Sequence, residues 1–127
     1  MRREIGWWLE ASERDGRMAA SLAEEGLFEG SAFHLQQSAE KALKALLLKL
    51  GRESRTHSCV HMARMLGEAG IDTASISVAC RKLDGHYIIS RYPNGVGGPP
   101  ADLYNEEIIG ELQECRDRIV GFVREHI

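Results

Sequence analysis

Three polar residues, Gln37, Lys41 and Lys44, follow one another at steps of four and three residues. On an α-helix this spacing puts their side chains on one face. Two ammonium groups beside an amide suit a phosphate, because an anion needs donors and positive charge. The residues also fit an ordinary solvated face, since Glu40 and Lys44 form a helical pair worth about 0.3 to 0.5 kcal/mol without a ligand. From their spacing alone, both interpretations stay open.

A second group lies near the end of a helical pattern. Tyr87 and Arg91 are four residues apart, and Tyr92-Pro93 follows directly before a glycine- and proline-rich loop over 94–100. A guanidinium group at such a helix end can bind a phosphate through two parallel hydrogen bonds. The alternative is that Arg91 bonds to the last carbonyl groups of its own helix.

Metal and cofactor chemistry finds little support in the residue pattern. His57 and His61 are four residues apart, but no third ligand follows at a usable spacing. No carboxylate lies three residues before a histidine, as di-iron bundles require. The glycines of 94–98 are followed by no Gly-Lys-Ser/Thr, so phosphate-binding loops of the Walker type do not fit. We therefore predict neither a metal nor a cofactor.

Composition predicts a single domain over residues 1–127. Its net charge of −3 argues against a general affinity for nucleic acid, which depends on lysine and arginine. Residues 41–64 nevertheless hold six cations and one anion, so we expect an anionic ligand there. The three cysteines form no CxxC pair and are expected to be reduced core residues. No apolar run is long enough to span a bilayer, which predicts a cytoplasmic protein without a membrane partner.

Apolar periodicity predicts the elements that position these residues. A helical period runs over about 5–25, then from Phe33 to Leu50, where Gly51 ends the helix. A third helix is expected after a cap at Thr56 or Ser58, closed by the glycines at 67 and 70.

The remaining chain predicts two more helices. One starts at Asp72 or Thr73 and ends at Tyr92 at the latest, because Pro93 cannot continue it. The last follows a cap at Asn105. No segment alternates like a strand, so the fold class is all-α, an antiparallel bundle of about five helices.

Three motifs together resemble the HEPN domain family. They are the run from Ser31 to Leu48 with its Gln-Gln-x-x-Glu-Lys-x-x-Lys, then Thr56-His57-Ser58, then Tyr87 to Asn94 with its Arg-Tyr-Pro-Asn. The resemblance implies a helical bundle, usually a homodimer, that binds nucleotides or RNA. It also implies a small nucleotidyltransferase as partner, often in a toxin-antitoxin pair. Carried over, the implied binding residues are Gln37, Glu40, Lys41, Lys44, His57, Tyr87, Arg91, Tyr92 and Asn94.

One departure from the family bears on catalysis. HEPN members that cleave RNA share an Arg, then four to six residues, then His, and no histidine follows Arg91 before His126. An arginine alone cannot shuttle protons near neutral pH, because its pKa is above about 12. This favours a binding module over an enzyme.

Two alternatives remain. Arg81 and His86 match the spacing of the ribonuclease motif, although a five-residue offset puts them about 140° apart on a helix. They would serve a metal-independent endoribonuclease toxin, as would a histidine supplied across a dimer. The other alternative is a protein-interaction module that docks the nucleotidyltransferase through exposed apolar residues such as Trp7 or Leu48.

Overall fold

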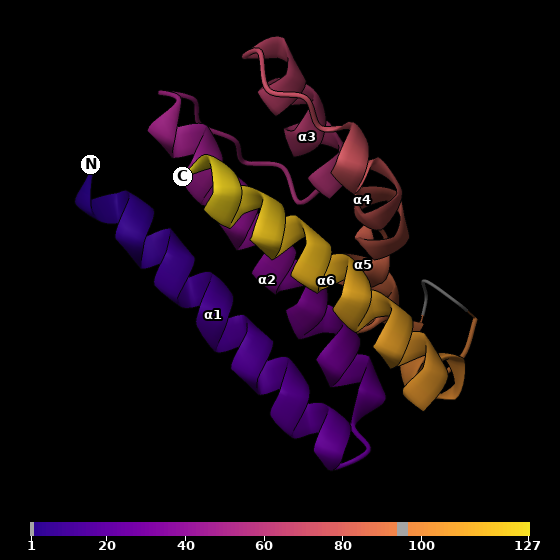
Figure 1. Cartoon of the computed structure of the whole chain (residues 1–127). Coiled ribbons are helices and arrows are strands. Elements are labelled where there is room, and N and C mark those ends of the chain that lie inside the picture. The colour runs from indigo at the N-terminus through magenta and orange to yellow at the C-terminus, as the bar shows by residue number, and fades with distance from the viewer. Residues whose placement is uncertain (1, 94–96) are drawn as a thin grey trace.

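The computed structural model describes residues 2–93 and 97–127, which form a bundle of helices (Figure 1). Three long helices, α1 (Arg3–Glu24), α2 (Phe28–Lys49) and α6 (Glu106–His126), lie side by side. A connection of three residues, 25–27, makes α1 and α2 antiparallel, and α6 runs in the direction of α2. The predicted all-α bundle is confirmed.

Shorter elements cover the side of α2 and α6 that faces away from α1 (Figure 1). They are α3 (Cys59–Glu68), the 3-10 turn η1 (Ala74–Ile76), α4 (Ser77–Leu83), α5 (His86–Ile89) and the 3-10 turn η3 (Pro100–Leu103).

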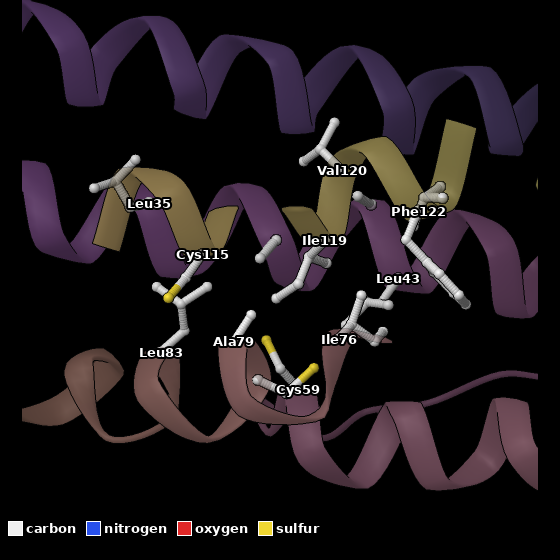
Figure 2. Close-up of a cluster of buried hydrophobic side chains, with 14 of the residues drawn as sticks. Leu35, Leu43, Cys59, Ile76, Ala79, Leu83, Cys115, Ile119, Val120 and Phe122 are labelled. Carbon is white, nitrogen blue, oxygen red and sulfur yellow. The ribbon is translucent and has the colours of Figure 1, made fainter. Parts of the chain in front are cut away.

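Helix α2 is the centre of the core. Leu35 and Leu43 of its apolar stripe are fully buried, close to Ile119 of α6 and Leu83 of α4 (Figure 2). The two ends of the predicted stripe differ, because Phe33 is half-buried and Leu50 is exposed. Each fully buried leucine stabilises the fold by about 1.5 to 3 kcal/mol, so this stripe fixes how α2 is oriented. The polar residues of α2 are thereby turned toward α1 on one side and toward the chain around α3 and α5 on the other.

Small residues bring α1 close to α2. The hydroxyl of Ser12 donates to the carbonyl oxygen of Ser38 at 2.7 Å, and the Ser38 hydroxyl donates to the carbonyl of Ser12 at 2.8 Å. Arg116 of α6 reaches across and donates from Nε to Ser38 Oγ at 2.9 Å. A Cβ at Gly16 would lie 2.6 Å from Nη2 of Arg116, so glycine leaves room for this side chain.

Two helix starts follow the sequence prediction. Ser58 Oγ accepts a hydrogen bond from the amide of His61, and Asn105 Oδ1 accepts one from the amide of Ile108. The second helix begins at Phe28, earlier than its apolar stripe indicated. The first helix of the bundle ends at Glu24, within one residue of the expected boundary.

The single helix predicted over 72–92 is wrong. The chain forms η1 and α4, leaves helical geometry at Asp84, and turns at Gly85, whose φ is +98°. Glycine adopts this backbone conformation readily, whereas residues with a Cβ rarely do. Only the single turn of α5 follows, so Arg91 lies beyond the end of a helix rather than on one.

Side-chain exposure agrees with the prediction for the cysteines but not with the prediction for Leu48. The three cysteines are buried free thiols, as expected, and burial raises the pKa of Cys80 to about 12. Trp7 is 60% exposed, but Leu48 is only 7% exposed because it packs with Ile5 of α1. The expectation that Leu48 is available for docking is therefore wrong. Within the described residues, no helix combines the length and the apolar character needed to cross a membrane.

Candidate functional site

Glu40 is the centre of a buried polar network on α2. The residue is 2% exposed, and its carboxylate lies 3.0 Å from Lys44 Nζ and 3.0 Å from His57 Nδ1. The amides of Gln36 and Gln37 donate to its Oε1 at 3.2 and 3.3 Å. A buried carboxylate is stable only when it is paired and hydrogen-bonded, and these four side chains supply that compensation.

His57 joins this network to α5. It lies in the connection between α2 and α3, and Gln36 Nε2 donates to its backbone carbonyl at 3.0 Å. Its ring stacks on Tyr87, with centroids 4.0 Å apart and planes 12° apart. The side chain remains 49% exposed. Because Nδ1 is bonded to Glu40, the ring is held in one orientation.

Arg91 extends the stack. Its Cζ lies 4.4 Å from the ring centroid of Tyr87, 4.6 Å from that of Phe33 and 5.0 Å from that of Tyr92. Its Nε donates to the carbonyl of Tyr87 at 2.8 Å, which is the contact expected of an arginine that satisfies the end of its own helix. Arg91 is an exposed residue, and its Nη groups make no hydrogen bond within the described residues. Cation–π contacts of this kind hold the charge in place.

The two lysines share a face of α2 but have different partners. Lys41 Nζ lies 2.6 Å from Oδ2 of Asp15 on α1, and that carboxylate is 3% exposed. Lys44 pairs with Glu40 and lies 5.5 Å from the ring centroid of Trp8. Both predicted phosphate ligands are thus paired with buried carboxylates. An ammonium group has three donors, so each retains hydrogen-bonding capacity beyond its ion pair.

A cavity of about 220 Å³ borders Lys44. The arginines at its rim, Arg52 and Arg55, are exposed and belong to the basic stretch that the charge count identified. The cavity is lined by Glu4, Trp8, Lys44, Leu48, Arg52, Glu53, Ser54 and Arg55.

Three residues of this region are not among the site residues that the sequence predicts. Gln36 is fully buried and donates to both the Glu40 carboxylate and the His57 carbonyl. In the sequence, its only signal is its place in the Gln-Gln motif. Phe33 supports Arg91. Asp15 is buried, and the signal that could have found it is a carboxylate in register with the buried positions Ser12 and Ala19 of α1.

The alternative pair, Arg81 and His86, bonds to separate partners within the described residues. Arg81 donates to Ser77 Oγ at 2.8 Å, whereas His86 Nδ1 lies 2.6 Å from the hydroxyl of Tyr104. Burial lowers the pKa of His86 and raises that of Tyr104 to about 12, and the tautomer of the histidine determines which of the two groups donates. The turn at Gly85 separates the two residues.

Two further sequence predictions concern single positions. Asn94 lies outside the described residues. The two histidines considered as a metal pair differ in their surroundings: His61 is exposed on α3, while His57 is bound to Glu40. The described residues hold no group of three His, Cys, Asp or Glu side chains that could bind a metal.

Comparisons with known proteins agree along nearly the whole chain. A family model described as HEPN domain matches residues 5–126. The crystal structure of TT1696 from Thermus thermophilus superposes with a TM-score of 0.93 at 30% identity, over 99% of this chain and 100% of that one. The crystal structure of ST0689, an archaeal HEPN homologue, superposes with a TM-score of 0.79 at 34% identity, over 98% of both chains. No curated protein matches.

Proposed function

The chain belongs to the HEPN domain family, and on that premise we propose that it is a nucleotide- or RNA-binding module. The module comprises residues 1–127 as one domain. It acts without catalysis of its own, beside a small nucleotidyltransferase and in a toxin-antitoxin pair.

The observation that carries this proposal is the stack of His57, Tyr87 and Arg91. A π surface and a cation come together there from two separate parts of the chain. The His57 side chain is 49% exposed and Arg91 is exposed, while Tyr87, which contacts both, is half-buried. Proteins bind single-stranded nucleic acid with this combination, because any base can stack on an aromatic ring while a cation neutralises the phosphate. Base stacking contributes about 1 to 3 kcal/mol for each base.

The ion pairs support an assignment of the residues that contact the phosphate. Within the described residues Arg91 pairs with no carboxylate, whereas Lys44 and His57 share the buried carboxylate of Glu40. We therefore assign the phosphate first to Arg91, with the remaining donors of Lys44 and the Nε2 side of the His57 ring beside it. Gln37 and Glu40 orient Lys44 and His57. Lys41 supports the site through its pair with Asp15, and Tyr92 adds a second aromatic surface against Arg91.

Calorimetric titration with ATP and with a short single-stranded RNA tests the proposal. Arg91→Ala and Tyr87→Leu should each weaken binding about tenfold, which corresponds to about 1.4 kcal/mol. Arg118→Ala, which removes an exposed arginine of α6, is the matched control and should leave affinity unchanged. Affinity should fall as salt rises. Absence of binding to both ligands, or equal loss in the control, would contradict the proposal.

A ribonuclease is the second candidate, favoured by the pair of His57 and Glu40. A histidine oriented by a buried carboxylate can act as a general base, and Arg91 contacts the same tyrosine ring that His57 does. This candidate predicts metal-independent RNA cleavage that His57→Ala abolishes and His86→Ala preserves. The proposed toxin of the Arg81–His86 type predicts the reverse.

The partners implied by the family form part of the proposal. We expect a homodimer and an interaction with the nucleotidyltransferase, for which the exposed Trp7 of α1 offers an apolar contact. Co-purification with the product of an adjoining nucleotidyltransferase gene should be lost in Trp7→Ala. If the complex forms while the protein binds neither ATP nor RNA, the chain is a protein-interaction module without its own ligand.

A further inference from the structure

A separate cavity of about 450 Å³ lies between α1 and α2, outside the stack of His57, Tyr87 and Arg91. Its volume falls within the range of about 300 to 1,000 Å³ that is usual for small-molecule sites. It is lined by Arg14, Arg17, Met18, Ser21 and Leu22 of α1 and by His34 of α2.

The polar side chains that line this cavity are two arginines, a serine and a histidine, and none of them is acidic. Arg14 and Arg17 lie three residues apart on α1, and both are exposed. In the part of the chain that the structure describes, neither takes part in an ion pair, and no carboxylate lines the cavity. Two guanidinium groups without a partner on the protein form a site for an anion.

His34 is held in a fixed orientation at the wall of the cavity. Its Nδ1 lies 2.7 Å from Oδ1 of Asp15, a carboxylate that is 3% exposed, and Lys41 neutralises the other oxygen of that carboxylate. Within residues 2–93 and 97–127, His34 Nε2 makes no hydrogen bond. The buried carboxylate therefore fixes the ring and leaves Nε2 as the nitrogen available to a ligand. A histidine on a face that only contacts water would not need a buried carboxylate to fix its ring.

Apolar side chains complete the cavity. Met18 is 41% exposed although it is a large hydrophobic residue, and Leu22 lies one helical turn further along α1. Methionine adapts its shape to a bound group, because its side chain is unbranched and polarizable. An apolar or aromatic body covering these two side chains would remove them from water.

We propose that this cavity binds an organic phosphate monoester. A phosphate monoester carries about −1.5 to −2 charges near neutral pH, which two arginines can neutralise, whereas a carboxylate carries only one. Arg14 and Arg17 bind the phosphate, the Ser21 hydroxyl donates to it, and Met18 and Leu22 pack against the organic body. Because His34 Nδ1 is bonded to Asp15, Nε2 accepts a hydrogen bond from a protonated phosphate oxygen when the ring is neutral and donates one when both ring nitrogens carry a proton. The site is independent of the nucleotide or RNA site proposed above.

Phenyl phosphate is a suitable probe, because it joins a phosphate monoester to an aromatic ring. Calorimetric titration of the full chain should show binding that Arg14→Gln and Arg17→Gln each weaken at least fivefold. Arg118→Gln, which alters an exposed arginine outside the cavity, should leave the affinity within twofold of the original protein. In NMR spectra, the methyl group of Met18 and the ring of His34 should shift on titration.

Several outcomes would overturn the proposal. Phenyl phosphate that does not bind, or binds equally well to both cavity variants, excludes the site. Benzoate that binds as tightly as phenyl phosphate excludes the preference for a phosphate monoester. Inorganic phosphate of equal affinity excludes a role for the apolar wall. Loss of binding in Arg91→Ala alone assigns the probe to the stack, and so contradicts a second site while leaving the proposed function intact.

Discussion

Asp84 caps helix α3 together with Ser58, although the two residues lie far apart in the sequence. The Ser58 hydroxyl donates to Asp84 Oδ2 at 2.8 Å, and the amides of Cys59 and Val60 donate to the same carboxylate at 2.7 and 3.1 Å. The cap ties the turn after α4 to the residue that follows His57. Because Tyr87 lies three residues beyond Asp84, this contact brings the tyrosine to the histidine ring on which it stacks.

We expect Asp84→Asn to destabilise the fold by about 2 kcal/mol, measured by urea denaturation. A charged acceptor of three hydrogen bonds at a helix N-terminus becomes a neutral one, and capping contributions reach about 2 kcal/mol. ATP or RNA affinity should also fall, because His57 and Tyr87 lose their common anchor. Asp102→Asn, at an exposed position in η3, should change neither property. Unchanged binding in folded Asp84→Asn would show that the stack assembles without the cap.

The sequence predicts this fold well because most of its helices carry a continuous apolar stripe. It fails over 72–92, where the period continues through Gly85 but the backbone does not. The break depends on Asp84 binding residues that lie more than twenty positions earlier in the chain. Local periodicity contains no information about that contact, so the sequence alone favours a single helix.

In the candidate site, too, the sequence predicts features within one helix but not contacts between helices. Spacing places Lys41 and Lys44 on one face, which is what the structure has. It cannot indicate that Asp15, on another helix, takes the charge of Lys41. A phosphate site argued from lysine spacing alone therefore overestimates the free positive charge, since side-chain pairing across helices is a property of the packed bundle.

Gly16 and Gly110 allow a test of the contact between α1 and α6. Both are helical glycines, and alanine at an open helix position gains about 0.5 to 1 kcal/mol. A Cβ at Gly110 meets no atom within 4 Å, so Gly110→Ala should be stabilising. A Cβ at Gly16 displaces the guanidinium of Arg116 from Ser38, so Gly16→Ala should be about 1 kcal/mol less stable than Gly110→Ala. Equal thermal midpoints for the two variants would contradict this role of Arg116.

Burial of His86 predicts a pH-dependent term in stability. Removal from water lowers its pKa below the usual 6.5, although a backbone hydrogen bond with Lys82 opposes the shift. The unfolded chain therefore binds a proton at His86 more readily than the folded protein does. The free energy of unfolding is thus highest above pH 6.5, and it decreases as the pH falls from 6.5 toward the lower pKa of His86 in the folded protein. Urea denaturation between pH 8 and 5 should show a steeper loss for the original protein than for His86→Gln. His61→Gln, which changes an exposed histidine, should retain the full slope.

The pair of Glu40 and Lys44 allows the energetic role of the buried network to be separated from ligand binding. Glu40→Gln leaves the ammonium of Lys44 beside a neutral amide, and breaking a buried ion pair on one side costs about 3 kcal/mol. Lys44→Met alone leaves the carboxylate with His57 and two glutamine amides, so its effect should be smaller.

The double variant Glu40→Gln/Lys44→Met should lose at least 1 kcal/mol less than the two single losses added together, because the second change removes the charge that the first left unpaired. Urea denaturation of all four proteins measures this coupling. Glu10→Gln, at an exposed position of α1, is the matched control for the glutamate substitution and should be neutral. Additive losses would mean that His57 and the glutamines, rather than Lys44, compensate the carboxylate. In that case Lys44 would retain its full charge for an anionic ligand.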